Sequence, residues 1–376
     1  MNGSNGGSKI TRRKFVQASG AAAGALALGA YIRPARSQER VLNWLTYPGH
    51  GAAEVVGPFE EKFGVKIRAK EYSGGEQMLA LIHGSPRGSF DLVTSDAPYV
   101  EKLRQAGFIE PMDPSRYPLD QFWPDFQKWP QHWLDGDFYA VMTSWGFNGL
   151  AYNANVLSES DVSSYRVMWQ EDLKGKVGMR QWYLPVMGCF SLHLGHKEPY
   201  NVSDAQFAKL KETMFSVKPQ VKGFWDFAGV FDSLANEVAY VVPGTGDWMT
   251  GLLQRDGHPI RSATTNEGAV MWTESASIVS GTQREQLCQE FIRYLTSTEG
   301  QIRLMTKSSY MASGPSQKAW EELNAKQPQV AEMINMDLDS NNLMDMLRKG
   351  HIVPRKLPAQ QSVEAWQQAY TEFQNL

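Results

Sequence analysis

The sequence predicts an α/β protein built of two lobes, and three observations support this fold class. Short apolar strands alternate with amphipathic helices in β-α-β units, an order that produces mostly parallel sheets flanked by helices. The alternation runs from 41 to 153 and is repeated through 155–265. The chain has 376 residues, of which 42% are hydrophobic, enough for about two domains of roughly 150 residues with sizeable cores.

The elements of the first lobe follow from this alternation. Strands are expected at 41–45, 65–69 and 90–94, and helices at 54–63, 75–83 and 99–105. Gly64 and Gly107 end the first and third helices, because glycine tolerates the left-handed conformation that often follows a helix. Two more strands, 139–142 and 149–153, follow a surface excursion rich in Pro and Trp.

The second lobe repeats the pattern and is followed by a largely helical segment. A strand is expected after Lys174, and Asn201, Ser203 or Asp204 can cap the next helix. The further elements are helices at 204–217, 231–236 and 248–255, strands at 237–242 and 269–278, and helices at 283–295, 301–305, 316–325, 343–349 and 363–373. Few long loops remain, which fits compact α/β lobes.

Two crossovers between the lobes are expected, near 147–154 and near 262–274. They divide the chain after the first 37 residues into lobe 1, residues 38–147 plus 275–376, and lobe 2, residues 148–274. The chain would therefore pass twice from one lobe to the other.

Charge is distributed unevenly along the chain. Residues 1–37 hold six Lys or Arg and no acid, whereas the rest holds 31 basic and 40 acidic residues, a net charge of −9. A body this acidic is unsuited to binding nucleic acid through its phosphates, so nucleic acid is not expected as a partner.

The first 37 residues are predicted to be a cleaved export signal. Residues 11–16 (TRRKFV) resemble the twin-arginine signal, Ser/Thr-Arg-Arg-x-Phe-Leu-Lys, without its final leucine and lysine. An uncharged run over 15–32 follows, and small residues at Ala35 and Ser37 suit a cut after Ser37. The expected partners in export are the Tat translocase and signal peptidase, and the expected location is the periplasm. The alternative is a membrane anchor, which the Gly- and Ala-rich run disfavours.

The sequence holds no pattern typical of catalysis. Gly-x-Ser-x-Gly, His-Glu-x-x-His and the P-loop motif are absent, and 244–246 (GTG) is best explained as a tight strand-to-helix turn. His193 and His196 have the spacing of metal ligands, but no neighbouring ligand completes a set. We therefore expect no enzyme, cofactor or metal. Cys189 and Cys288 are expected to be buried free thiols, with a disulfide as the alternative.

Several segments, in order, resemble the spermidine/putrescine-binding proteins of ABC transporters. The resemblance covers most of 41–320 and fades in the C-terminal helices. The matching segments are 43–47 (NWLTY), 59–66 (FEEKFGVK), 91–93 (DLV), 99–103 (YVEKL), 145–146 (WG), 152–153 (YN), 267–268 (EG) and 272–275 (WTES). Each segment alone is a weak signal, whereas their order and spacing together are specific.

The resemblance implies a type II-like periplasmic-binding-protein fold that closes its two lobes on a ligand in the hinge cleft. It also implies a permease in the inner membrane as partner, a monomeric state, and polyamine ligands held by aromatic walls and carboxylates. Matching the family position by position makes these residues candidate ligand contacts: Trp44, Tyr47, Ser95, Asp96, Trp272, Glu274 and Tyr310.

The sequence departs from the family on one side of the expected site. After 174–175 the family has a pair of acids for the second amine, whereas this chain has no acid and an additional arginine, Arg180. The family's central tryptophan is displaced, and Asp247 and Trp248 lie in its place. A long diamine needs an acid at each end, because a buried unpaired ammonium is very costly. The hypothesis is therefore a smaller cationic or zwitterionic solute, with Arg180 facing a carboxylate or phosphonate.

Alternative interpretations accompany these assignments. Each tryptophan could pack in the core, Glu274 could form a surface salt bridge, Asp96 and Asp247 could cap helices, and Arg180 could be solvated. For the whole protein the alternatives are true polyamine binding, and a sensory binding protein that reports to a membrane receptor. An iron-binding relative would need paired tyrosines, and the sequence has no adjacent Tyr-Tyr pair.

Overall fold

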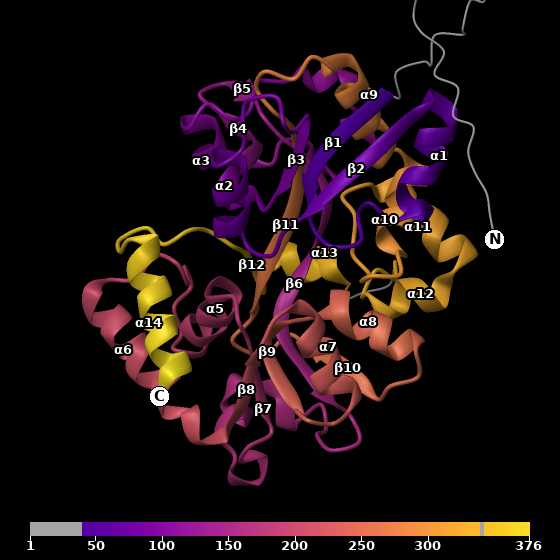
Figure 1. Ribbon diagram of the computed structural model, residues 1–376. Coiled ribbons are helices and arrows are strands. Elements are labelled where there is room, and N and C mark those ends of the chain that lie inside the picture. Colours follow the sequence, from indigo (N-terminus) through magenta and orange to yellow (C-terminus); the bar gives the residue numbers. More distant parts are fainter. Residues whose placement is uncertain (1–39, 339–341) are drawn as a thin grey trace, which may run out of the picture. The chain divides into compact units, whose positions relative to one another are not determined.

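The structure is a computed structural model that describes residues 40–338 and 342–376 (Figure 1). The segment Arg40–Leu376 is one compact unit in which helices pack against a mixed sheet of ten strands, so the predicted α/β class is confirmed. The expected export signal, 1–37, lies outside the described residues.

The strands of this sheet come from both expected lobes. Their order is β2 (Val65–Glu71), β1 (Arg40–Thr46), β3 (Leu92–Ser95), β11 (Ala269–Ile278), β6 (Val141–Asn153), β9 (Val241–Thr245), β7 (Val177–Arg180) and β8 (Val221–Trp225). β10 (Ile260–Ala263) pairs with β6, and β12 (Ile352–Pro354) pairs with β11. A separate hairpin joins β4 (Trp133–Leu134) to β5 (Asp137–Phe138). The β1–β3 end and the β7–β9 end of the sheet are therefore linked through β11 and β6.

The predicted parallel pairing holds at the two ends of the sheet and fails in its middle. β1 is parallel to β2 and β3, and β7 is parallel to β8 and β9, as β-α-β units require. β11 and β6 instead run antiparallel to each other, and β6 is antiparallel to β9. The strands expected at 139–142 and 149–153 are one long strand, β6, because residues between them continue the ladder with β11. β6 and β11 pass through the expected crossovers, while the division into lobes stays a prediction.

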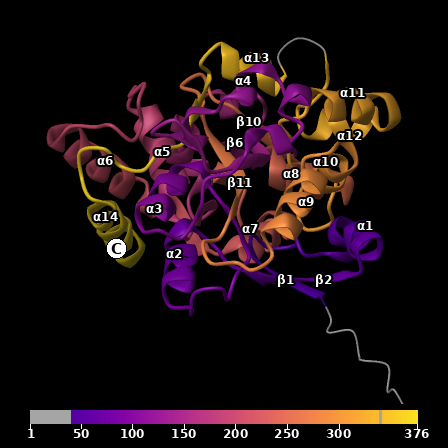
Figure 2. The same ribbon diagram turned by 90° about the horizontal axis from the view of Figure 1, so that it is seen from above.

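One group of helices surrounds the β1–β3 end of the sheet. It comprises α1 (Ala53–Phe63), α2 (Gly75–His83), α3 (Val100–Gln105), α9 (Glu285–Leu295) and α10 (Thr298–Met305). α1 ends where Gly64 takes a left-handed φ of 58°, as predicted. α11 (Gln317–Lys326) packs on α10, and α12 (Pro328–Met333) packs on α11 and on α8 (Figure 2). The short helices α4 (Pro124–Gln127) and α13 (Leu343–Arg348) complete the set.

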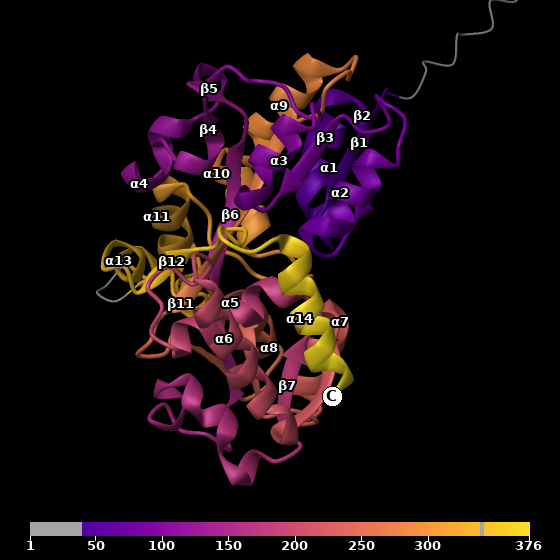
Figure 3. The same cartoon turned by 90° about the vertical axis from the view of Figure 1, so that its left-hand side faces the viewer.

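A second group of helices covers the β7–β9 end. It comprises α5 (Tyr183–His193), α6 (Asp204–Ser216), α7 (Phe227–Ala235), α8 (Asp247–Arg255) and α14 (Val363–Asn375). α6 begins at a capping box in which Ser203 accepts from Gln206 N, so one of the three expected caps is confirmed. The C-terminal helix α14 packs on α5 and α6 (Figure 3), although the sequence-based division assigns its residues to lobe 1.

Several element boundaries differ from the sequence-based expectation, and two of these differences have a clear local cause. α7 begins at Phe227 rather than at 231, because the Asp226 side chain accepts from Gly229 N and caps the helix earlier. β9 begins at Val241 rather than at 237, because Glu237 has a positive φ of 56° and the chain turns there. Cys189 and Cys288 are both buried and free, as expected.

Candidate ligand-binding site

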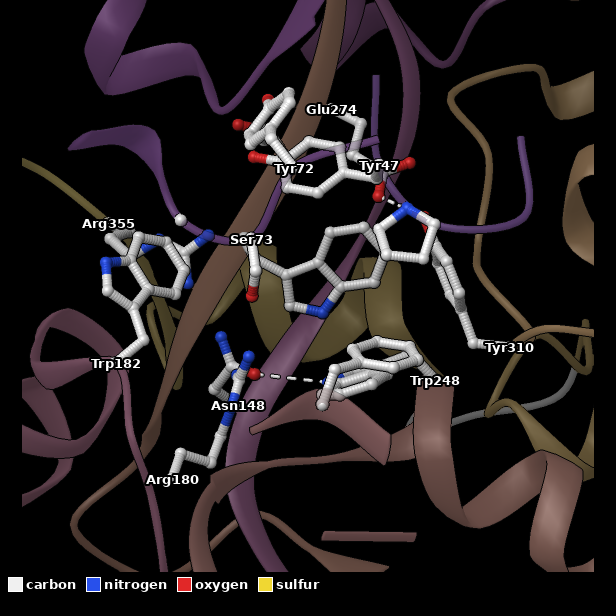
Figure 4. A pocket seen from close by; sticks show the side chains of 15 residues that line it. Tyr47, Tyr72, Ser73, Asn148, Arg180, Trp182, Trp248, Glu274, Tyr310 and Arg355 are labelled. Carbon is white, nitrogen blue, oxygen red and sulfur yellow. Dashed lines mark hydrogen bonds between the residues drawn. The ribbon is translucent and has the colours of Figure 1, made fainter. Parts of the chain in front are cut away.

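A small cavity, with a volume of about 60 Å³, lies where the ends of several strands meet (Figure 4). Its lining comes from the segments just after β1 and β2, from β6, β11 and the end of β7, from the starts of α7 and α8, and from loops near 310 and 355. The lining residues are Tyr47, Pro48, Tyr72, Ser73, Gly74, Asn148, Arg180, Trp182, Phe227, Trp248, Trp272, Thr273, Glu274, Tyr310 and Arg355. Parallel strands that end at one edge commonly form such a site.

Glu274 supplies the only carboxylate among the described residues of this lining. Its Oε1 accepts a hydrogen bond from Tyr310 OH, and its Oε2 lies 3.1 Å from His50 Nε2. His50 in turn lies 2.7 Å from Tyr310 OH, so the three side chains form one buried network. The carboxylate is therefore held in place before any solute arrives.

A buried lysine gives Glu274 a positive neighbour. Lys307 is 1% exposed, donates to Leu304 O, and lies with its Nζ 3.5 Å from the centre of the Tyr310 ring. Burial raises the pKa of Glu274, but attraction to His50 and Lys307 and the hydrogen bond from Tyr310 outweigh it and lower the pKa to about 2. Burial lowers the pKa of Lys307 to about 8, although Glu274 opposes this shift. Glu274 is thus ionised and largely compensated by the protein itself.

Arg180 enters the cavity from the opposite side in Figure 4. Its Nη1 donates to Gly244 O at 2.8 Å, and its guanidinium lies 5.2 Å from the Trp248 ring centre and 5.9 Å from that of Trp182. Burial, with repulsion from Arg355, lowers the pKa of Arg180 to about 10, so the group remains charged at neutral pH. Among the described residues, no carboxylate forms an ion pair with it. Arg180 is therefore a cation without a countercharge in the described part of the chain.

Arg355, just after β12, is the second arginine of the lining, and its charge is neutralised by Asp96. Its Nε donates to Asp96 Oδ2 at 2.6 Å, and its guanidinium lies 4.6 Å from the Trp182 ring centre. Asp96 also accepts from the backbone N and the side-chain Oγ1 of Thr273. The pair is buried, and it joins the end of β3 to β11 and to the segment after β12.

Six of the ten predicted contact residues line the cavity, namely Tyr47, Arg180, Trp248, Trp272, Glu274 and Tyr310. They come from five separate segments of the chain, with Trp272 and Glu274 both on β11, and the fold brings them together.

The other four predicted residues lie outside the lining, each for a structural reason. Trp44 is 1% exposed, donates to Thr94 Oγ1, and packs edge-on against Phe291 in the core. Asp96 faces Arg355 rather than the cavity. Ser95 is fully buried on β3, and Asp247 is buried at the start of α8, where its Oδ1 accepts from Trp248 N. The core alternative therefore describes Trp44. The helix-cap alternative does not describe Asp96, whose side chain caps no helix and pairs with Arg355, nor Asp247, because Gly246 is the N-cap of α8.

Three lining residues carry a weak signal or none in the sequence. Asn148 lies on β6, where nothing in the local pattern separates it from an ordinary strand residue. Arg355 lies in the C-terminal segment, where the family resemblance fades. Trp182 stands in the segment that departs from the family, and that departure was the available signal.

Glu76 of α2 contacts Trp182, one of the side chains that line the cavity. It accepts from Tyr99 OH at 2.6 Å, from Tyr183 OH at 2.9 Å and from Trp182 Nε1 at 3.2 Å. Because Tyr183 begins α5, these bonds connect the helices around β1–β3 with those around β7–β9.

Comparison with known proteins adds independent information. The family model of the bacterial extracellular solute-binding proteins matches residues 54–332. The spermidine/putrescine-binding periplasmic protein of Escherichia coli (strain K12) is 25% identical over 281 residues, 73% of this chain and 77% of that protein. The solved structure of a putative spermidine/putrescine ABC transporter from Listeria monocytogenes has a TM-score of 0.76 at 16% identity, over 89% of this chain and 99% of that one. A periplasmic binding protein from A. tumefaciens B6 in complex with glucopine has a TM-score of 0.67 at 14% identity, over 89% and 99%.

The likeness to these solved structures concerns the fold, which is the two-lobed fold of periplasmic binding proteins. In the part of the chain that the structure describes, no helix has the length and apolarity needed to cross a membrane, and no cluster of His, Cys, Asp and Glu has the arrangement of a metal site. The matched family consists of transport proteins rather than enzymes, and its members take a small-molecule ligand and an ABC permease partner. The chain therefore belongs to the bacterial extracellular solute-binding proteins, the extracytoplasmic substrate-binding components of ABC importers.

Proposed function

We propose that this protein binds a small solute with one amine centre, cationic or zwitterionic, and delivers it unchanged. The observation that carries the proposal is the pairing of charges in one cavity. Glu274 is the sole carboxylate of the described lining, and Arg180 faces it without a carboxylate partner. A solute that carries an amine at one end and an oxyanion at the other complements both.

Each end of such a solute has a physical partner. The amine lies near Glu274 and the faces of Tyr47 and Trp272, where a cation over an aromatic ring gains about 0.5–2 kcal/mol. The planar guanidinium of Arg180 can bind a carboxylate or phosphonate through two parallel hydrogen bonds. The cavity of about 60 Å³ holds only a few atoms, so the proposal includes separation of its walls when a solute enters.

Polyamine binding is the second candidate, and the names of the curated relatives favour it. A diamine brings two ammonium groups, whereas the described lining offers one carboxylate, which already has the Lys307 cation as a neighbour. A buried ammonium without a partner is strongly unfavourable. The charges of the cavity therefore support a zwitterion over a diamine.

The proposal extends to export and assembly. The protein leaves the cytoplasm through the Tat translocase, is cut after Ser37, and acts as a periplasmic monomer whose lobes present the solute to an inner-membrane permease. A sensory protein would report to a receptor instead. Solute-dependent stimulation of the ATPase in the reconstituted permease separates the two roles.

A thermal-shift panel on the protein purified from the periplasm tests the solute class. The panel holds amino-acid derivatives, betaines, aminophosphonates, putrescine and spermidine. A solute at 100 times its dissociation constant adds about 2.7 kcal/mol of stability, a shift of a few degrees. Stabilisation by zwitterions that disappears in Arg180→Ala is expected. Stabilisation by the two polyamines alone would overturn the proposal.

A further inference from the structure

Two buried N–H groups on the neighbouring central strands have no hydrogen-bond acceptor. Asn148 on β6 is 1% exposed and Trp272 on β11 is 6% exposed, and both side chains line the cavity. Within residues 40–338 and 342–376, neither Asn148 Nδ2 nor Trp272 Nε1 has a hydrogen-bond partner. Buried N–H groups are nearly always paired, so two such donors at one cavity indicate an acceptor that binds there.

The sheet explains why the two donors lie close together. Trp272 pairs with Gly146 across the β6–β11 ladder, and Gly146 and Asn148 lie on the same face of β6, two residues apart. A Cβ on Gly146 would lie within 2.8–2.9 Å of the Trp272 ring, so glycine is required for the indole to rest on the strand. The indole N–H is thereby held over β6, on the face that carries Asn148.

A third side chain fixes the orientation of the Asn148 amide. Trp248 Nε1 lies 3.2 Å from Asn148 Oδ1 (Figure 4). An indole N–H can only donate, so the atom facing it must be the amide oxygen. The NH₂ group of Asn148 consequently points away from Trp248 and remains available as a donor.

We propose that Asn148, Trp272 and Arg180 form an oxyanion seat that binds a carboxylate or phosphonate of the solute. All three offer donors where an acceptor is needed, and an ammonium group, which has no lone pair, cannot accept from them. Arg180 supplies the charge and lacks a carboxylate partner, and the two neutral donors supply direction. The inference rests on the proposed function and deepens it, because it makes the oxyanion obligatory and assigns Trp272 as a hydrogen-bond donor.

Asn148→Asp is the sharpest test of the oxyanion seat. The substitution keeps an oxygen for Trp248 Nε1 and replaces the free NH₂ with a negatively charged oxygen. The probes are 4-aminobutyrate and putrescine, which differ by a carboxylate in place of one aminomethyl group, together with the best zwitterion of the thermal-shift panel. Calorimetry is expected to show at least about 100-fold weaker binding of the zwitterions and no loss for putrescine. Asn155→Asp, on the exposed turn after β6, carries the same charge change and is the matched control.

A second variant keeps the test decisive if Asn148→Asp folds poorly. Trp272→Phe removes only the indole donor and is expected to weaken zwitterion binding about tenfold. Trp320→Phe, at a buried indole that donates to Gly314 O away from the cavity, is the matched control. In ¹⁵N spectra, the Trp272 indole resonance is expected to shift with carboxylates, acetate included, and not with methylammonium.

The outcomes separate the two proposals. Zwitterion binding that is unchanged by Asn148→Asp and Trp272→Phe would overturn the oxyanion seat and leave the proposed function standing. Putrescine binding by the unaltered protein that is tighter than the binding of every zwitterion would overturn both. A Trp272 resonance that no carboxylate moves in the folded protein would also overturn the seat.

Discussion

The two ends of the cavity carry opposite charges, and they differ in how far neighbouring side chains compensate those charges. At one end Glu274 is surrounded by His50, Tyr310 and Lys307, which hold and compensate the carboxylate. At the other end Arg180 has a backbone carbonyl and aromatic rings as its neighbours, and no carboxylate among the described residues. The protein compensates the charge at the Glu274 end, although Glu274 Oε2 has no hydrogen-bond partner among the described residues. It leaves the charge at the Arg180 end for the solute to pair.

This difference teaches where discrimination between solutes should arise. A solute amine at the Glu274 end competes with partners that the carboxylate already has, so its net gain is small. An oxyanion at the Arg180 end meets a cation without a carboxylate partner among the described residues, and its absence leaves a half-buried charge unpaired. We therefore expect substitutions at the Glu274 end to change stability most, and substitutions at the Arg180 end to change solute selection most.

The largest expected effect is a loss of stability in Glu274→Gln. The substitution removes one of the two carboxylates, Glu274 and Glu54, that stabilise the charge of buried Lys307, and removing one partner of a buried charged group costs about 4 kcal/mol. Urea denaturation at pH 7 measures the change in the free energy of unfolding. A loss below about 1 kcal/mol would mean that the protein does not compensate Glu274 as described.

The double variant Glu274→Gln with Lys307→Met is the matched control. It removes both charges, so most of the lost stability should return while the amine end stays without its carboxylate. Stability that fails to return would assign the loss to packing rather than to charge.

Replacing Asp247 tests whether its buried carboxyl group is ionised and could neutralise Arg180. It is buried beside Trp248, and burial raises its pKa to about 8, which keeps it protonated at neutral pH. Since its unfolded pKa is about 3.9, its contribution to stability is full below pH 4 and is lost as the pH rises to about 8. Asp247→Asn should therefore raise the free energy of unfolding at pH 7 by about 3 kcal/mol, and leave solute affinity unchanged because Asp247 does not line the cavity.

The measurement is unfolding in urea from pH 4 to 8. Asp256→Asn, exposed at the other end of α8, is the control and should leave the pH profile nearly unchanged. If Asp247→Asn lowers stability at pH 7, Asp247 is ionised there and the contrast between the two ends fails.

The smallest expected effect concerns Glu76, which connects the two groups of helices next to Trp182. Glu76→Gln keeps the shape and weakens hydrogen bonds to two tyrosines and one indole, so solute affinity should fall about tenfold, mainly through faster dissociation. Stopped-flow tryptophan fluorescence separates the two rate constants. Glu101→Gln, at an exposed acid on α3, should change neither. An effect confined to the association rate would contradict a closing contact.

The local sequence predicted most helices and strands because their ends depend on nearby residues, such as helix caps and glycine turns. The 204–216 helix, for example, has a capping box that any reader of Ser203 and Gln206 can expect. The strand-to-helix turn at 244–246 follows from its glycines, and β9 and α8 lie on either side of it. The antiparallel pairing of β6 with β11 was not predicted, because it joins segments more than a hundred residues apart.

The residues of the candidate site also fall into two groups, those that the sequence selected correctly and those whose position only the fold decides. Tyr47, Trp272 and Glu274 stand in segments whose order resembles a known family, so the sequence alone selected them. Trp44 has the same signal but faces the core, because alternate residues of a strand point to opposite faces and only the fold decides which face is buried.

The sequence by itself determined the α/β class, the family resemblance, and the departure that put Arg180 where acids are expected. The tertiary structure alone decided that Arg355 and Asp96 pair, that Lys307 lies near Glu274, and that Asn148 keeps a free donor beside Trp272. The physical reason is that charge compensation and hydrogen-bond satisfaction depend on distances between residues far apart in the chain. Sequence pattern records local periodicity, whereas those distances are fixed only when the strands take their places in the sheet.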